Sequence, residues 1–527
     1  MVARQVLRNA LIVDGSGTAA FPGALSIIGG RIESIGTVPS NAGDIDFDCG
    51  GRILMPGFID VHSHADGLLF REDVQLALLR QGLTTVIGGQ DGVSYAPGDG
   101  QYASEYFAAV NGEHPSYRGR TVAELLASYD HATRLNFAYT VPAGTVRFEV
   151  MGWESCPADA EQLRQMQELI AGGLADGAVG LSSGLDYVPG MFSGTQELTA
   201  LCAPVALAQS IYVTHMRGGY EANSAKGLGE IAEICRRTGV RAHVSHFHAD
   251  PDLVIRLMAQ LSSQAVDVTF DAYPYVRGCT LLGMPLLPPW LAAKSVDEII
   301  QDLANSDTRD TLRTSWFPEV EMNASLGPEW PSMITLSHIA APDYNWAHGM
   351  TIAEASDRSG RDAIDFSLDV LLASRLEVNA VMAVRHHRSA EELGRILAHG
   401  AHMGGSDGIF VGAHPHPRAY GTFGRYLSEY VQNLGTYTWP SVAIHLSARA
   451  ADRFQLGDRG RLIEGYMADL VLVRAEMVTD NSSYEFPLEL TTGIDDVFVS
   501  GVQVLADGAL TAHLPGLGLR RAQASTG

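Results

Sequence analysis

The chain has 527 residues, 46% of them hydrophobic, which is enough for a core larger than that of one simple domain. Against 60 acidic residues it has 36 lysine and arginine residues, and the resulting formal charge of −24 disfavours nucleic acid and anionic membranes as partners. Small molecules are therefore the expected partners, and a homo-oligomer is left open. The five cysteines lack CxxC spacing, and the N-terminal sequence lacks the apolar run of a signal peptide or membrane anchor, so we expect a cytoplasmic protein.

Both ends of the chain show short strand patterns separated by glycine-rich turns. Examples are "ALSIIGGRIESIG" near the N-terminus and "GYMADLVLVRAE" near the C-terminus. Chain ends often meet in one domain. We therefore expect residues 1–56 and 425–527, the latter mainly through 460–510, to form one small β-sandwich.

The middle of the chain alternates short apolar strands with amphipathic helices, which is the pattern of parallel β/α units. The candidate strands are 57–64, 84–89, 135–141, 177–183, 210–216, 241–247, 267–273 and 401–407. Eight such strands predict a TIM (β/α)8 barrel over residues 57–424. The interval between the seventh and eighth strands is too long for one connection, so we expect an inserted lid or subdomain at about 280–345.

Four of these strands end in side chains that bind metals or carry protons. His62 and His64 lie two residues apart on the first strand, so both imidazoles point to one face. His215 ends the fifth strand, His246 the sixth and Asp407 the eighth. Each residue alone has an ordinary explanation as a core histidine or a turn aspartate. Their joint position at the carboxyl ends of barrel strands, where barrel enzymes assemble their sites, favours a shared function.

A cluster of histidines and a carboxylate suits one or two divalent ions of the zinc type, with an open position for water. The ion lowers the pKa of that water to about 7 and polarises a carbonyl, while a nearby carboxylate carries the proton. The pattern therefore predicts hydrolysis of an amide or a related C–N bond. Asp91, in "GGQDG" after the second strand, is by itself a good turn residue.

Longer motifs resemble a known family. "PGFIDVHSHAD", "VSHFH", "DAYPY", "GGSDG" and "HPHPRAYGTF" are similar to the amidohydrolase superfamily, and specifically to the N-acyl-D-amino-acid deacylase (D-aminoacylase) family, from about residue 8 to 520. The resemblance implies hydrolysis of linear amides by a metal-bound hydroxide, with Asp407 as general acid/base. It also implies a tight metal at His215 and His246, and a second, weaker one at His62 and His64.

Asp91 departs from that family, because the matching position normally holds a cysteine that binds metal. Our hypothesis is that both carboxylate oxygens of Asp91 bridge two ions. Zn²⁺ is the first expectation, but an oxygen ligand in place of a thiolate makes Mn²⁺ or Co²⁺ more competitive.

The resemblance also implies a set of side chains around the substrate. Tyr187 and either Tyr273 or Tyr275 match the family's substrate contacts, whereas His248, Arg277 and Cys279 stand near the substrate where this chain departs from the family. His248 stands where the family has a lysine that faces the substrate carboxylate, and Arg277 could restore that positive charge. Cys279 falls near an expected hydroxyl. The alternative substrates are another amide, a lactam, a cyclic imide or a carbamate without an α-carboxylate. A metal-dependent decarboxylase is less favoured, and so is a protein that only binds.

Overall fold

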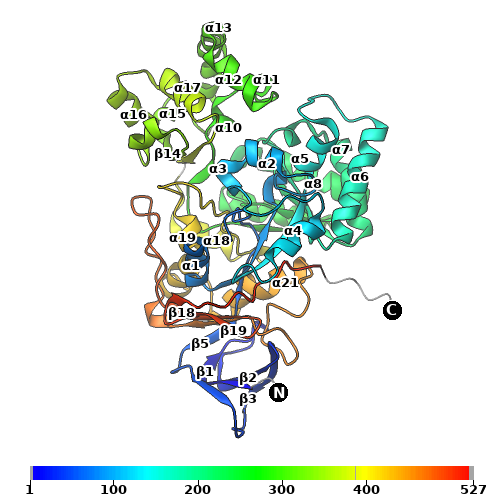
Figure 1. Cartoon of the computed structure of the whole chain (residues 1–527), viewed down its shortest axis with the longest axis vertical. Coiled ribbons are helices and arrows are strands. Elements are labelled where there is room, and N and C mark those ends of the chain that lie inside the picture. The colour runs from blue at the N-terminus through cyan, green and yellow to red at the C-terminus, as the bar shows by residue number, and fades with distance from the viewer. Residues whose placement is uncertain (1–3, 324, 386, 522–527) are drawn as a thin grey trace.

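The computed structural model describes residues 4–323, 325–385 and 387–521. Residues 1–3 and 522–527, at the ends of the expected β domain, lie outside this description. The chain forms a β domain, a central barrel and an inserted subdomain, which follow one another along the long axis of the molecule (Figure 1).

The β domain is one nine-stranded sheet built from both ends of the chain. Its strands are β1 (Gln5–Ile12), β2 (Phe21–Ile28), β3 (Arg31–Gly36), β4 (Ile45–Asp48), β5 (Ile53–Pro56), β17 (Leu470–Val473), β18 (Ile494–Val499), β19 (Val502–Ala506) and β20 (Ala509–Leu510). Their order is β20-β19-β18-β17-β5-β1-β2-β3, with β4 also paired to β1. Antiparallel pairing of β17 with β5 joins the two ends of the chain. The predicted origin of this domain in both termini is confirmed.

The segment that begins at residue 425 is helical rather than part of the β domain. Helices α19 (Arg418–Leu427), α20 (Trp439–Ala443) and α21 (Arg449–Arg453) precede β17. Ala450 and Phe454 pack in one core with Ile59 and Val61 of the barrel. The strands that the C-terminal part of the chain adds to the β domain, β17 to β20, lie after these helices, within residues 470–510.

Eight parallel strands form the barrel. They are β6 (Phe58–Asp60), β7 (Leu83–Gly88), β8 (Asn136–Pro142), β9 (Gly180–Gly184), β10 (Ile211–His215), β11 (Arg241–Val244), β12 (Val268–Asp271) and β16 (His402–Met403), in the order β16-β12-β11-β10-β9-β8-β7-β6. A parallel bridge between Ser63 and Gly408 links the two end strands, and the Asp407 N–H donates to the His62 carbonyl at 2.7 Å. The predicted (β/α)8 barrel is confirmed.

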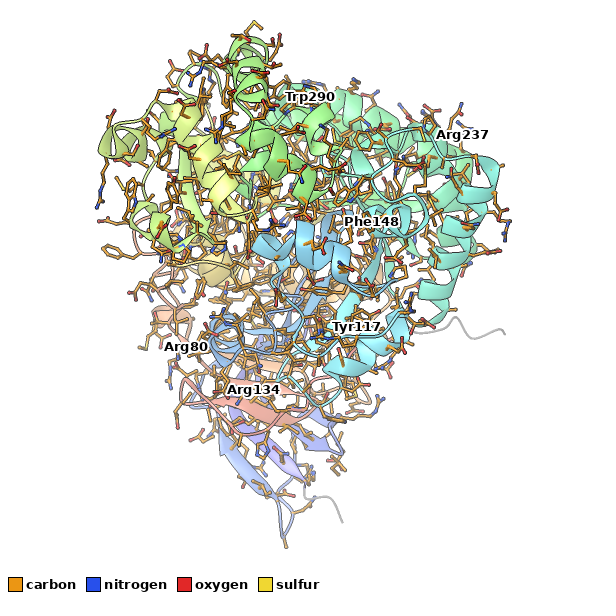
Figure 2. The ribbon with its side chains drawn as sticks, turned by 45° about the horizontal axis from the view of Figure 1, so that its top comes forward. Arg80, Tyr117, Arg134, Phe148, Arg237 and Trp290 are labelled. Atoms are coloured by element: carbon orange, nitrogen blue, oxygen red, sulfur yellow. The ribbon has the colours of Figure 1, made fainter. Side chains whose placement is uncertain are left out.

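Helices with buried apolar stripes surround the strands. The longer ones are α1 (Glu72–Arg80), α4 (Val122–Tyr129), α5 (Ala143–Met151), α6 (Ala160–Ala175), α7 (Thr195–Leu207), α8 (Ser224–Thr238), α9 (Pro251–Ser263) and α18 (Ala390–Leu397). Capping boxes begin α4 at Thr121, α6 at Asp159 and α18 at Ser389. Arg80 and Arg134, marked in Figure 2, donate to the Thr491 and Thr511 carbonyls of the C-terminal segment, which fastens the barrel to the β domain.

The insert is a subdomain with its own sheet and core. Its strands β13 (Gly278–Leu281), β14 (Ile334–Ile339) and β15 (Val378–Met382) pair antiparallel in the order β13-β15-β14. Its helices include α12 (Val296–Ala304), α14 (Phe317–Met322), α16 (Ile352–Ser359) and α17 (Ala363–Ala373). An insert between the seventh and eighth barrel strands was predicted and is confirmed. It extends past residue 345, because β15 is the central strand of its sheet.

Among the residues described, no helix combines the length and the apolar character needed to span a membrane.

Candidate metal centre and active site

The predicted ligands meet at the carboxyl ends of the barrel strands. His62 and His64 follow β6, Asp91 follows β7, His215 ends β10, His246 follows β11 and Asp407 follows β16, and all six are buried. They form two potential metal-binding groups within the described part of the chain: one of His62, His64, Asp91 and Asp407, the other of Asp91, His215 and His246. The ligand atoms of each group lie within 4.8 Å of one another. The structure therefore brings together all the residues that the sequence suggested as metal ligands, with Asp407 beside them.

Asp91 belongs to both groups. Its Oδ1 lies 3.6 Å from His62 Nε2, and its Oδ2 lies 3.6 Å from His64 Nε2 and 3.8 Å from His246 Nε2. His215 Nδ1 is 3.9 Å from the same Oδ2 and 3.1 Å from His246 Nε2. One carboxylate thus lies among all four imidazoles, with Oδ1 near His62 and Oδ2 near His64, His215 and His246.

The polar atoms at the centre of the cluster fit a cation. Three polar atoms have no hydrogen-bond partner among the described residues: both ring nitrogens of His62 and Oδ1 of Asp91. Leaving such atoms buried without a partner costs free energy that a bound ion would recover. Nitrogen and carboxylate oxygen donors also match the ligand preference of a zinc-type ion. The residues present therefore fit one or two divalent metals.

The local electrostatics favour positive charge at the same place. Burial alone would lower the pKa of His62 and His64, but nearby carboxylates raise it to about 8 in His62, through Asp271 and Asp91, and to about 10 in His64, through Asp407 and Asp91. Burial alone would raise the pKa of Asp91, yet the charge of His62 and the imidazoles of His246 and His64 hold it well below its usual range. The carboxylates therefore remain charged and available to a cation.

Outer contacts fix which nitrogen of two rings faces the centre. The Asn111 amide donates to the Val93 carbonyl, so its oxygen accepts from His64 Nδ1 at 2.9 Å. Asp186 Oδ2 accepts from His215 Nε2 at 3.1 Å. The other ring nitrogens, Nε2 of His64 and Nδ1 of His215, then face Asp91, as in metal sites whose histidines are oriented by a second partner.

Asp407 lies between the histidines and a buried arginine. Its Oδ1 is 3.3 Å from His64 Nε2, and its Oδ2 is 2.8 Å from Arg418 Nη1. Burial would raise the pKa of Asp407, but the charges of Arg418 and His246 and the contact with His64 lower it to about 2. Asp407 is therefore an ionised carboxylate that can accept a proton.

Three members of the cluster have strained backbones. Asp91, His246 and Asp407 have φ values of 53°, 34° and 50°. Residues other than glycine rarely adopt this left-handed region, and such strain concentrates at functional sites. The barrel holds these three side chains in place at a cost in local conformational energy.

Three of the expected substrate residues lie beside the cluster. The Tyr187 ring is 5.3 Å from His215, and its hydroxyl contacts Thr280 Oγ1 at 2.8 Å. His248 packs 4.4 Å from Tyr273. Burial and the charge of Arg388 hold the pKa of His248 well below its usual range, so this ring is neutral.

The other expected substrate residues make different contacts. Tyr275 donates to Asp480 Oδ2 at 2.6 Å, and the Arg277 guanidinium stacks 4.2 Å from the Tyr484 ring. Cys279 is buried, and burial raises the pKa of its thiol to about 11. The structure thus places Tyr275 and Arg277 against the 480–484 segment, where they brace that loop.

Arg418 is the functional candidate that sequence reasoning missed. Its guanidinium is fully buried, lies 4.6 Å from the centre of the Tyr273 ring and donates to the Cys279 carbonyl at 3.2 Å. The available signal was "HPHPR", because His416 Nδ1 accepts the Arg418 N–H at 3.0 Å and so fixes the start of α19.

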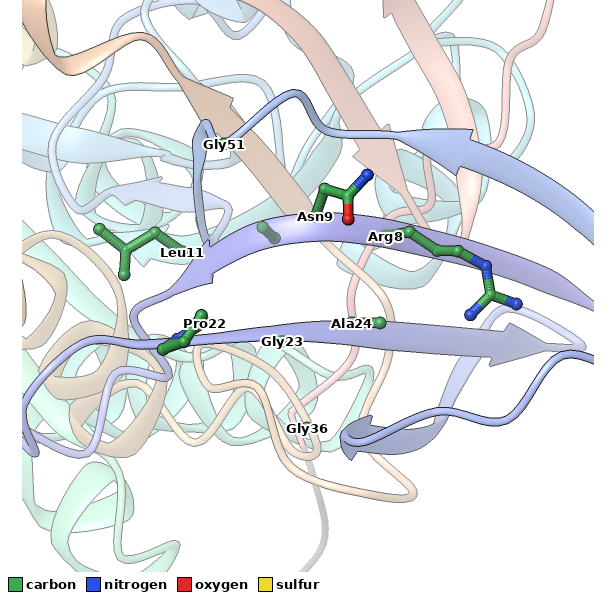
Figure 3. Close-up of a pocket in the computed structure, with 9 residues that line it drawn as sticks. Arg8, Asn9, Leu11, Pro22, Gly23, Ala24, Gly36 and Gly51 are labelled. Atoms are coloured by element: carbon green, nitrogen blue, oxygen red, sulfur yellow. The ribbon is translucent and has the colours of Figure 1, made fainter.

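An open hollow of about 520 Å³ lies far from this cluster, on the β domain between β1 and β2 (Figure 3). Its polar side chains already have partners: Arg8 Nε donates to Asp46 at 2.7 Å and Asn9 to Asp48 at 2.9 Å. It lacks the titratable cluster found at the barrel end.

A (β/α)8 barrel with a carboxylate shared between two histidine pairs, and a second carboxylate beside them, defines a metal-dependent hydrolase of the barrel type. The sequence profile of the amidohydrolase family matches residues 47–286 and 335–504. The chain belongs to the amidohydrolase family. The unmatched stretch between these two parts, residues 287–334, falls within the insert.

Full-length relatives narrow the comparison. The chain is 29% identical to D-aminoacylase of Alcaligenes xylosoxydans xylosoxydans over 539 residues, which covers 98% of both chains. It is also 29% identical to N-acyl-D-glutamate deacylase of the same organism over 529 residues, 98% of this chain and 96% of that one. The resemblance predicted from the motifs is confirmed.

Two crystal structures share the complete architecture. A D-aminoacylase structure superposes with a TM-score of 0.80 at 27% identity and covers 98% of this chain and 99% of that one. The N-acyl-D-glutamate deacylase of Bordetella bronchiseptica, complexed with zinc and a phosphonate mimic of the tetrahedral intermediate, gives 0.82 at 25% identity with the same coverage.

Proposed function

We propose that this protein is a metal-dependent hydrolase that cleaves the amide bond of N-acyl-D-amino acids. The observation that carries the proposal is the cluster itself: Asp91 shared between two histidine pairs, with Asp407 and a buried arginine next to it. Similarity to D-aminoacylase and to N-acyl-D-glutamate deacylase over nearly the whole chain supports the substrate class.

The two ligand groups would hold two ions with Asp91 between them. His215, His246 and Asp91 would hold one ion, and His62, His64 and Asp91 would hold the other. Zn²⁺ is the first candidate, with Mn²⁺ or Co²⁺ competing because the shared ligand is an oxygen donor. A bound ion would polarise the amide carbonyl and lower the pKa of a water molecule toward neutrality.

Asp407 would move the proton. As an ionised carboxylate beside His64, it can take a proton from the attacking water and return it to the departing nitrogen. The products are a carboxylate and a free amino acid. The ion pair with Arg418 keeps Asp407 charged before attack and orients its second oxygen toward the reacting groups.

Arg418 would bind the α-carboxylate of the substrate. Its Nε has no hydrogen-bond partner among the described residues, and the Tyr273 ring fixes the plane of the guanidinium. A planar guanidinium binds carboxylates through two parallel hydrogen bonds. Arg418 would thus bind the carboxylate in place of His248 or Arg277, which the sequence suggested for this role. His248 is neutral, and Arg277 stacks on Tyr484.

The test is amine release from N-acetyl-D-methionine, from its L enantiomer and from the matching D-amino-acid amide, by protein loaded with Zn²⁺ or Mn²⁺. We expect turnover of the D acid alone. Equal turnover of the D acid and its neutral amide would remove the carboxylate from the proposal, and hydrolysis of none of the three would reject this substrate class.

One observation favours a second candidate, an amide without an α-carboxylate. Two related enzymes act on acyl-D-amino acids, but here the position of the family's lysine holds His248, which burial keeps neutral. If the Arg418 guanidinium pairs only with Asp407, no fixed positive charge is left for a substrate carboxylate. Turnover of the neutral amide alone would support this candidate. A cytoplasmic location and any self-association stay predictions from the sequence.

A further inference from the structure

One buried carboxylate outside the two ligand groups contacts a residue of each. Asp271 ends β12 and is fully buried. Its Oδ1 accepts a hydrogen bond from the His246 backbone N–H at 2.8 Å. Its Oδ2 accepts from His243 Nε2 at 3.0 Å and lies 3.5 Å from His62 Nδ1. The same side chain therefore touches the ligand after β6 and the ligand after β11.

The Asp407 loop also packs against Asp271. A Cβ atom at Gly405 would lie 2.8 Å from Asp271 Oδ1, so only glycine leaves room for the carboxylate there. His246, whose N–H binds Asp271, has a φ of 34°. Asp271 thus binds the backbone of a ligand residue with an unusual φ, and it packs against the loop that carries Asp407.

We propose that Asp271 is the positioning residue that couples the two metal sites. With a cation between His62 Nε2 and the carboxylates of Asp91 and Asp407, the His62 proton must lie on Nδ1, and Asp271 Oδ2, 3.5 Å away, is the acceptor that favours it there. The lone pair on His62 Nε2 then points toward Asp91 Oδ1 and Asp407 Oδ1, each 3.6 Å away. Its Oδ1 fixes His246 at the other site. This inference rests on the metal centre of the proposed function and adds a residue that acts through the ligands.

Asp271→Asn is the direct test. The amide keeps the shape of the side chain but replaces one acceptor oxygen with an NH₂ donor, which would drive the His62 proton to Nε2. Loss of such an outer partner typically weakens metal affinity 10- to 100-fold. We expect a loss of that size for Zn²⁺ at the His62 and His64 site, measured by competition with a chromophoric chelator, together with a lower bound zinc content.

His243 provides the matched control, because it binds the same Oδ2 but belongs to neither ligand group. His243→Gln leaves Asp271 opposite His62 and should retain wild-type zinc affinity. Wild-type affinity in a folded Asp271→Asn protein would overturn the inference. An equal loss in His243→Gln would also overturn it, since the effect would then come from core packing. Failure of the wild-type protein to bind zinc would instead reject the metal centre and, with it, the proposed function.

A second measurement is made on the wild-type protein, and a variant serves only to assign the signal. In the zinc-loaded wild-type protein, ¹⁵N NMR of the histidine rings should show the His62 proton on Nδ1. The signal is assigned by its absence in His62→Gln. A neutral His62 with its proton on Nε2 would overturn the inference.

Discussion

The barrel end and the β domain differ in how their charged side chains are paired. In the β domain, charged side chains are paired with one another, as in Arg4 with Asp44 at 2.9 Å and Arg8 with Asp46 at 2.7 Å. At the barrel end, Asp91 and His62 are buried with unpaired atoms, and Asp91 and Asp407 have strained backbones. Folding alone gives no reason to retain such groups. The contrast indicates that the barrel end is adapted to chemistry and the β domain to stability.

The largest effect should come from Asp407→Asn. The amide keeps the size of the side chain but cannot carry the proton, and general acid/base catalysis contributes about 10²- to 10⁴-fold. We expect kcat to fall by about 10³-fold while the metal content stays at the wild-type level, measured by amine release and by elemental analysis. A variant with wild-type kcat would remove Asp407 from the chemistry.

Next in size is the effect of replacing Asp91, the ligand that both groups share. Asp91→Ala should reduce the occupancy of both sites, because each loses an oxygen donor. Asp91→Cys is the matched variant: it should retain metal and shift preference from Mn²⁺ toward Zn²⁺, since thiolates select softer ions. Elemental analysis after dialysis against equal amounts of the two metals measures both results. Full occupancy in Asp91→Ala would show that Asp91 does not bridge the ions.

Most residues of the candidate metal centre could be predicted from the sequence. The spacing of His62 and His64 and the strand ends at His215, His246 and Asp407 located the centre, since parallel strands bring their carboxyl ends together. Arg418 could not be located in this way, because it lies on a helix after the last strand and reaches Asp407 only through the fold.

The extent of the insert was also beyond the sequence pattern. The pairing of β15 with β13 joins residues about a hundred positions apart, and no local signal in the sequence specifies that register. Asp271 is a similar case: "DAYPY" was recognised as a motif, but the contacts of its aspartate with His62 and His246 come from three different strands.

Arg418→Lys should have an intermediate effect that sharpens the substrate assignment. Lysine keeps the charge but loses the planar pair of donors, and hydrogen bonds to charged groups contribute about 1.5–3 kcal/mol. We expect KM for N-acetyl-D-methionine to rise by about 10- to 100-fold. The KM for a neutral amide, where measurable, should not change. Equal rises for both substrates would mean that Arg418 acts only on Asp407.

The smallest effect is expected for Arg8→Ala, which tests the other side of the comparison. Arg8 borders the hollow of the β domain and pairs with Asp46, more than half of whose side chain is exposed. Exposed ion pairs contribute about 1 kcal/mol or less, because water already solvates both charges. Arg8 also donates to the Val38 carbonyl at 3.0 Å, a bond that contributes about 0.5–1.5 kcal/mol, so the free energy of unfolding in urea should fall by about 2 kcal/mol or less, with kcat/KM unchanged. A drop in kcat/KM as large as that of Arg418→Lys would show that the β domain acts on the active site, and the division between chemistry and stability would no longer hold.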